Sequence, residues 1–167
     1  SQYVPALSKL EFGQANFIAG TEQTIFESSA GRFGVLICYE AAFADYTRRY
    51  VLSGADFLVN ITNDGWFGPG AGPLQHAEMA ILRAVENRVT LARAAYTGVS
   101  MIVDPAGRVS DRVELFTEGM ILGAPRRAAS PSFYSKHGDA VFFIMALASI
   151  VLAGALARRA ESGAAAV

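Results

Sequence analysis

The lone cysteine of this 167-residue chain is its first candidate for a reactive group. Cys38 ends an apolar run at residues 34–37 that is typical of a short buried strand, and residues 41–51 after it are typical of a helix. A thiol near a helix N-terminus is favoured as the thiolate, which is the nucleophilic form of cysteine. The sequence therefore presents Cys38 either as a nucleophile or as a small buried apolar side chain, the commoner role of a single cysteine.

The two residues after the cysteine could assist a nucleophilic reaction at Cys38. The backbone N–H of Tyr39 follows the candidate nucleophile at a helix start, where it is placed to stabilise an oxyanion. Glu40 allows two interpretations: its carboxylate caps the helix that follows, or it positions a general base or an incoming amine.

A glycine-rich loop and the start of the next helix carry the remaining candidates. These candidates for a substrate pocket are Asn63, Asp64, Trp66 and Phe67 in the loop, and Gln75 and His76 in the helix. The two aromatic side chains either fold back into the core or form the wall of an apolar substrate pocket. For His76 we expect a structural hydrogen bond, because the order and spacing of Cys38 and His76 lack the local signature of papain-like enzymes.

Composition narrows the classes of function. With two histidines and one cysteine, which form no cluster, the sequence predicts no metal site, and we expect no cofactor. A net charge of -1 and a pI near 6.1 argue against a nucleic-acid surface.

The order of predicted elements indicates an α/β layer with parallel strands in its first half. We expect strands at 23–27, 33–38 and 56–62, helices at 42–53 and 74–94, a hairpin at 99–103 and 108–113, and a last strand at 119–123. Within the second helix, Arg83, Glu86 and Arg93 are expected on a solvated face that carries ion pairs.

An uncharged run near the C-terminus predicts a transmembrane helix. The 18 residues from Ala140 to Ala157 would form a helix about 27 Å long, close to the ~30 Å of a bilayer core. Aromatic and basic residues before the run, together with Arg158 and Arg159 after it, fit interface anchors, although a buried core helix is the alternative. We therefore divide the chain into a domain at 1–126, a linker at 127–139, a membrane helix at 140–157 and a tail at 158–167.

Six ordered motifs resemble those of the nitrilase, or carbon–nitrogen hydrolase, superfamily. They are Gly34 to Glu40 (GVLICYE), Asn63 to Gly68 (NDGWFG), Gly72 to Ala80 (GPLQHAEMA), Arg83 to Asn87, Thr97 to Ser100, and Asp104 to Gly107. Within that superfamily the Cys-Tyr-Glu triplet, the Asn-Asp-Gly-Trp-Phe-Gly loop and the predicted membrane helix are most similar to the apolipoprotein N-acyltransferases.

This resemblance implies a partial αββα sandwich in which Cys38 aligns with the nucleophile of a Cys–Glu–Lys set. The family's general base Glu and its Lys are expected upstream of Ser1, as if the chain were the C-terminal piece of a longer protein. Gln2 stands before Tyr3-Val4-Pro5, where the family pattern has a Glu, either as a true substitution or as an effect of the chain end.

The resemblance also implies a reaction and a location. A fatty acyl group would pass from a phospholipid, through a thioester on Cys38, to the N-terminal amine of a diacylated apolipoprotein. The enzyme would lie in the bacterial inner membrane with its catalytic domain facing the periplasm. Two alternatives stay open: a soluble carbon–nitrogen hydrolase that uses water, and a non-catalytic binding module tethered to the membrane.

Overall fold

The computed structural model describes residues 20–126 and 130–164, without the side chains of residue 155 and of residues 157–164. The strands are β1 (Ile25–Ser28), β2 (Gly31–Ile37), β3 (Phe57–Thr62), β4 (Thr90–Ala95), β5 (Ser100–Val103) and β6 (Val109–Val113). The helices are η2 (Cys38–Ala42), α1 (Ala44–Leu52), η3 (Asp64–Phe67), α2 (Gly72–Asn87), α3 (Phe133–His137) and α4 (Ala140–Ala164). Ser1 and Gln2, which entered the sequence interpretation, lie outside the described residues.

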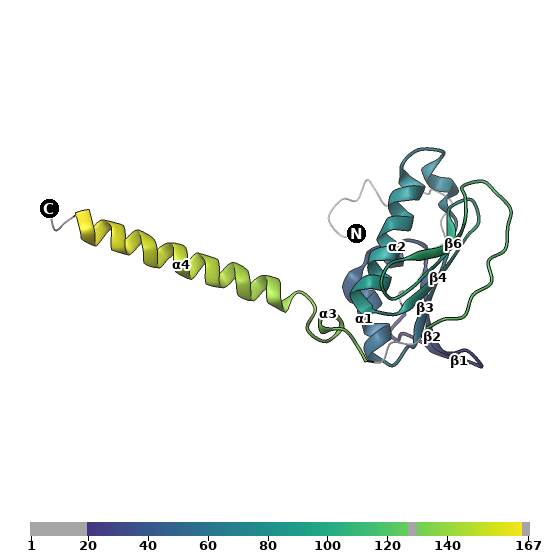
Figure 1. Ribbon diagram of the computed structural model, residues 1–167, viewed down its shortest axis with the longest axis horizontal. Coiled ribbons are helices and arrows are strands. Elements are labelled where there is room, and N and C mark those ends of the chain that lie inside the picture. Colours follow the sequence, from purple (N-terminus) through teal and green to yellow (C-terminus); the bar gives the residue numbers. More distant parts are fainter. Residues whose placement is uncertain (1–19, 127–129, 165–167) are drawn as a thin grey trace, which may run out of the picture.

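The six strands form one sheet in the order β1-β2-β3-β4-β5-β6 (Figure 1). β2, β3 and β4 run parallel, and the register pairs Val35 with Val59 and Val59 with Ala92. β1 pairs antiparallel with β2, while β5 and β6 continue the sheet antiparallel on the other side. The predicted α/β layer with parallel strands in its first half is confirmed.

One face of the sheet carries the core. Side chains alternate between the faces of a strand, so Leu36, Leu58 and Leu91 lie on the same face and are fully buried. Tyr50 of α1 and Ala80 of α2 pack in the same cluster. The small residues of α2 let this helix approach the sheet closely, which brings its N-terminal turns near the end of β2.

The opposite face of the parallel strands is only partly covered. Ile37 and Ile61, which are register partners, are exposed, and a hollow of about 300 Å³ lies beside Val59, Ala92 and Ala94. The described residues therefore form a sheet with α1 and α2 on one face, and the αββα arrangement is present only in part.

Two predicted elements were wrong. The helix predicted to reach residue 94 ends at Asn87, because Arg88 adopts the left-handed conformation (φ 54, ψ 41) and Thr90 then begins β4. The run Leu91-Ala92-Arg93-Ala94 has good helix propensity, but pairing with β3 and β5 decides its structure. The strand predicted at 119–123 is not formed.

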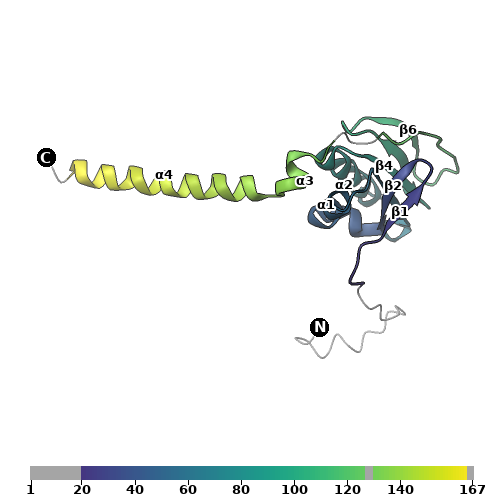
Figure 2. The ribbon, with the colours of Figure 1, turned by 90° about the horizontal axis from the view of Figure 1, so that it is seen from below.

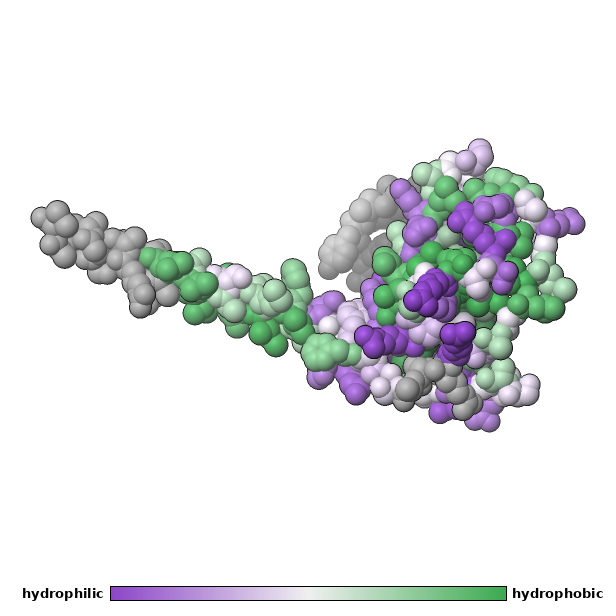
Figure 3. All heavy atoms as spheres, in the orientation of Figure 1, coloured by the Kyte–Doolittle hydropathy of each residue, from purple (hydrophilic) through white to green (hydrophobic). Residues whose placement is uncertain are grey.

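The C-terminal segment is fixed to the domain by a short helix and then leaves it (Figures 1 and 2). The Ser135 hydroxyl donates to Asn87 Oδ1 at 2.8 Å, and Arg48 Nη1 donates to the Ser135 carbonyl oxygen at 3.1 Å. α4 then projects with apolar side chains exposed along its first half (Figure 3). Within the described residues, no helix is both long enough and apolar enough to cross a membrane. The membrane helix predicted at 140–157 stays a prediction.

Candidate active site

Cys38 occupies a sharp turn between β2 and η2. Its φ of 52 lies in the left-handed region, which costs a residue other than glycine about 1–3 kcal/mol and recurs at active sites. The turn falls at the C-terminal end of a parallel strand, the edge at which open α/β sheets bind their ligands. The half-buried thiol is thus presented where a ligand can approach it.

Two buried side chains hold the backbone carbonyl of this turn. Asn60 Nδ2 donates to the Leu36 carbonyl oxygen at 2.9 Å and to that of Cys38 at 3.3 Å. Nε2 of His76 lies 3.2 Å from the Cys38 carbonyl oxygen. His76 therefore contacts the backbone of the cysteine, as expected for a structural hydrogen bond.

Beneath the turn lies a charged cluster of four residues, Asn60, Asp64, His76 and Arg93, which we call the elbow network. Each is at most 3% exposed. Asp64 Oδ1 lies 2.8 Å from Nδ1 of His76, while Asp64 Oδ2 accepts from Arg93 Nη2 at 2.7 Å. Arg93 Nη1 also donates to Asn60 Oδ1, which closes the network.

Further contacts complete the polar shell of the elbow network. Arg93 Nε donates to the Val99 carbonyl oxygen at 3.2 Å, and the Thr62 hydroxyl donates to Asp64 Oδ1 at 3.0 Å. Burial lowers the pKa of Arg93, whereas the charges of Asp64 and Cys38 act in the opposite direction. The guanidinium is thus buried among groups that compensate its charge.

The elbow network corrects two sequence interpretations. Arg93 was expected on a solvated helix face, but it lies on β4 with its side chain buried, because residues 90–95 form a central strand. Asp64 was expected to line a substrate pocket, but it is buried against Arg93 and His76. Arg83 is also buried and pairs with Glu86 at 2.9 Å, so the predicted solvated face is wrong there as well.

Sequence reasoning missed Asn60 and Arg93 as site residues. Asn60 stands in the apolar run FLVNIT and Arg93 in TLARAA, each at a position that shares a face with a buried leucine two residues earlier. A buried polar residue needs partners, so a polar side chain at an inward strand position is the signal that could have found them.

Tyr39 and Glu40 follow Cys38 in η2 and make different contacts. Glu40 Oε2 accepts the backbone N–H of Ile37 at 2.7 Å, which is the contact that the capping interpretation predicts. The Tyr39 ring is half exposed and lies 5.6 Å from the His76 ring, centroid to centroid. Tyr39 also meets Phe43 edge to face at 5.9 Å.

The glycine-rich loop presents its aromatic residues at the surface. Trp66 is 85% exposed, so the alternative in which it folds back into the core is wrong. The Phe67 ring lies 5.6 Å from that of His76 and is also exposed. Asn63 Oδ1 accepts the backbone N–H of Gly65 at 3.0 Å and thereby shapes the loop, whereas Gln75 is exposed in the first turn of α2.

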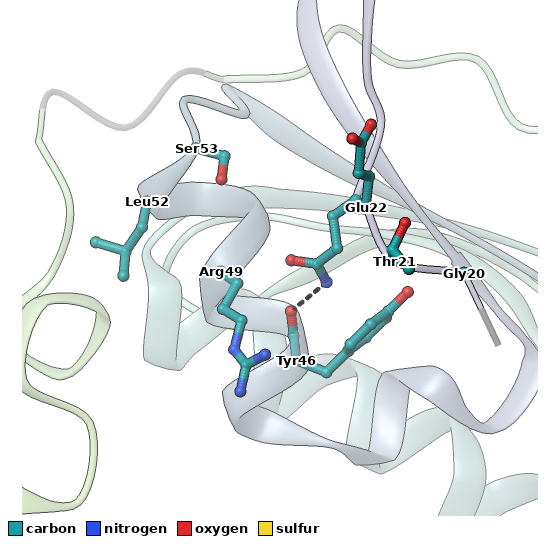
Figure 4. Close-up of a pocket in the computed structure, with 8 residues that line it drawn as sticks. Gly20, Thr21, Glu22, Tyr46, Arg49, Leu52 and Ser53 are labelled. Carbon is teal, nitrogen blue, oxygen red and sulfur yellow. Dashed lines mark hydrogen bonds between the residues drawn. The ribbon is translucent and has the colours of Figure 1, made fainter.

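A separate hollow of about 680 Å³ contains none of the predicted site residues. It lies between α1 and residues 20–23, where the Gln23 amide donates to the Tyr46 carbonyl oxygen at 3.0 Å (Figure 4). Residues 20–126 and 130–164 hold no group of three His, Cys, Asp or Glu side chains arranged for a metal ion. Among the described residues, several of the predicted site residues meet around Cys38, whose backbone is strained. The rings of Tyr39 and Phe67 beside His76 form an aromatic rim, and the buried elbow network supports the turn.

Comparison with known proteins gives a consistent result. A family model described as carbon–nitrogen hydrolase matches residues 4–129. The apolipoprotein N-acyltransferase of Geobacter metallireducens is 40% identical over 162 residues, which cover 97% of this chain and 31% of the relative. Apolipoprotein N-acyltransferase 1 of Treponema pallidum is 39% identical over 149 residues, covering 87% of this chain and 27% of that protein.

A solved structure supports the fold. Saccharomyces cerevisiae Nit3, a member of branch 10 of the nitrilase superfamily, superposes with a TM-score of 0.50 at 26% identity, over 59% of this chain and 39% of that one. The chain spans less than a third of the length of the two acyltransferases that it matches.

Proposed function

Because the chain belongs to the carbon–nitrogen hydrolase family, we propose that it is the C-terminal part of an acyltransferase that matures bacterial lipoproteins. The observation that carries this proposal is the strained turn at Cys38, which presents the thiol at the C-terminal end of a parallel strand. The similarity to apolipoprotein N-acyltransferases selects acyl transfer among the reactions of the family.

The proposed reaction has two steps. In the first, the Cys38 thiolate attacks the ester carbonyl of a phospholipid acyl chain; a C–S bond forms, the C–O bond breaks, and the lysophospholipid alcohol leaves with a proton. In the second, the N-terminal amine of a diacylated apolipoprotein attacks the thioester; an amide C–N bond forms, the C–S bond breaks, and the thiol is restored. Dividing the transfer into two steps lowers the barrier of each.

The residues around Cys38 would serve these steps in different ways. The backbone N–H of Tyr39, the second residue of η2, is a candidate donor to the oxyanion, while Glu40 would position the base or the incoming amine. Trp66 and Phe67, which are exposed on the glycine-rich loop, would contact the acyl chain, and Asn63 and Gln75 would contact the polar part of a substrate.

Other parts of the proposed enzyme lie away from the surface around Cys38. The general base Glu and the Lys of the family pattern are expected upstream of this chain. If the predicted span at residues 140–157 is the membrane anchor, the domain would lie in the periplasm, with Arg158 and Arg159 in the cytoplasm. We accordingly expect the 167-residue chain alone to transfer no acyl group, since catalytic groups act as a unit.

Trapping the covalent intermediate tests this proposal. The full-length enzyme is incubated with phospholipid, and the peptide that contains Cys38 is examined by mass spectrometry for an acyl adduct. We expect the adduct in the unmodified enzyme and its absence in Cys38→Ala and Cys38→Ser, because a hydroxyl is far harder to deprotonate than a thiol. Full transfer by Cys38→Ala, or an adduct on another residue, would exclude the proposed mechanism.

A further inference from the structure

We infer that His76 is held as an imidazolium between the Asp64 carboxylate and the Cys38 carbonyl, and that its positive charge favours the thiolate form of Cys38. His76 would thus be a positioning residue for the nucleophile. A role of His76 in catalysis rests on the function proposed above, whereas its effect on the Cys38 thiol does not.

The contacts of the two ring nitrogens carry this inference. Nε2 lies 3.2 Å from the Cys38 carbonyl oxygen, which can only accept a hydrogen bond. Nδ1 lies 2.8 Å from Asp64 Oδ1, and that carboxylate is also the ion-pair partner of Arg93. A neutral imidazole has one N–H and satisfies one of these acceptors, whereas the imidazolium satisfies both.

Each neutral tautomer of His76 leaves one ring nitrogen lone pair facing a buried oxygen atom. With the proton on Nε2, the lone pair of Nδ1 would face Asp64 Oδ1 at 2.8 Å, although it could accept from Arg93 Nη2 at 3.2 Å. With the proton on Nδ1, the lone pair of Nε2 would face the Cys38 carbonyl oxygen. A ring lone pair that faces a buried oxygen acceptor at these distances is repelled by it, so the doubly protonated ring fits this site best.

The aromatic rim supplies a second, independent observation. The rings of Tyr39 and Phe67 each lie 5.6 Å from the His76 ring, centroid to centroid. An aromatic ring attracts a cation placed within about 6 Å of it. His76 therefore has two aromatic neighbours within the distance of a cation–π contact.

The charges of the elbow network point in the same direction. An imidazolium at His76, the guanidinium of Arg93 and the carboxylate of Asp64 add up to one net positive charge beneath a half-buried thiol. A thiolate at Cys38 would neutralise that charge. Nearby cations are the usual cause of reactive cysteines.

One acidic group opposes this effect. Glu40 is the third residue of η2, which Cys38 begins, and the negative charge of its carboxylate disfavours a thiolate. Glu40 is partly exposed to solvent and accepts the N–H of Ile37, so its charge is better screened than those of the buried elbow network.

Alkylation of the thiol tests the inference without any substrate. In the full-length enzyme, the rate at which iodoacetamide modifies the Cys38 peptide is followed by mass spectrometry across pH. We expect His76→Gln, which keeps a donor but carries no charge, to lower the rate at neutral pH by about tenfold and to match the unmodified enzyme at high pH. The control is His137→Gln. His137, the other histidine, is exposed on α3, so this substitution should leave the pH profile of alkylation unaltered.

Two outcomes would overturn the inference. The first is a loss of rate in His76→Gln that is equal at every pH, which would mean that His76 only shapes the turn. The second is the signal of a neutral ring for His76 at neutral pH, measured by nitrogen NMR on the unmodified enzyme with isotope-labelled histidine. The NMR measurement decides the question even if His76→Gln does not fold.

The alkylation profile also separates this inference from the proposed function. If the profile depends on His76 as expected but Cys38→Ala still transfers acyl groups, the elbow network controls the thiol and the proposed reaction is wrong. If Cys38 is acylated but its profile is indifferent to His76, the reaction stands and the inference fails.

Discussion

The backbone N–H of Ile37 donates to the carboxylate of Glu40 at 2.7 Å, across the turn that contains Cys38. This bond ties the last residue of β2 to the first turn of η2 and so holds the strained residue from both sides. Glu40 therefore has a structural role in the turn, whatever part it takes in the chemistry.

Substitutions at Glu40 separate these two roles. Glu40→Gln keeps an oxygen that accepts the Ile37 N–H, so we expect the free energy of unfolding to change by less than about 1 kcal/mol. Loss of the charge should lower acyl transfer by roughly 10²-fold, if the carboxylate orients the base or the amine. Steady-state transfer and thermal unfolding of the full-length enzyme measure the two effects. Glu78→Gln, on the exposed face of α2, should alter neither, and unchanged transfer in Glu40→Gln would reduce Glu40 to a cap.

A glycine behind the elbow network offers a steric test. A Cβ at Gly98 would overlap the carboxylate of Asp64, whereas a Cβ at Gly70 would meet nothing within 4 Å. We expect Gly98→Ala to lower the free energy of unfolding by about 1–3 kcal/mol, as overpacking of a core does, and to slow alkylation of Cys38. Gly70→Ala, the matched control, should change stability by no more than about 0.5 kcal/mol. Equal stability of the two variants would show that the network tolerates displacement of Asp64.

The parts of the fold that could be predicted are those determined by residues close together in the sequence. The strand before Cys38 is an apolar run, and the hairpin between β5 and β6 is encoded by Asp104, whose Oδ1 accepts the N–H groups of Ala106 and Arg108 at 2.8 and 2.9 Å. Local hydrogen bonds of this kind need no partner from elsewhere in the chain.

The parts that could not be predicted depend on distant partners. β4 has helix-forming residues and becomes a strand only because β3 and β5 flank it, and this burial gives Arg93 its place in the site. Arg93 and Asp64 are 29 positions apart, so their ion pair appears in no local pattern. The sequence motifs identified Cys38, Asp64 and His76 as candidates. They did not predict that the buried guanidinium of Arg93 pairs with Asp64, which in turn contacts His76.

Glu86 should make the free energy of unfolding depend on pH in the acidic range. Burial raises the pKa of Glu86, the charge of Asp139 acts in the same direction, and Arg83 opposes them. Because the folded-state pKa lies above the unfolded value, the stabilising contribution of the protonated form is complete below the ordinary pKa and is lost as the pH rises through the raised value. We expect Glu86→Gln to be more stable than the unmodified protein above this window and equal to it below.

Unfolding midpoints measured across acidic and neutral pH check this expectation. Glu78→Gln on the same helix is the control, because its side chain is exposed. A stability difference for Glu86→Gln that does not change with pH would show that the burial of Glu86 has no electrostatic cost.

The predicted membrane span at residues 140–157 can be tested at its centre. Ala148 lies on the exposed surface of α4, in the middle of the uncharged run. If the helix crosses a bilayer, an arginine there should cost about 2.5–3.5 kcal/mol on insertion scales, so we expect Ala148→Arg to lower the inserted fraction in a glycosylation-mapping assay. Ala124→Arg, in an exposed loop of the domain, should insert as the unmodified protein does. If Ala148→Arg and the unmodified protein were retained equally in membranes after alkaline carbonate treatment, residues 140–157 would not be the anchor.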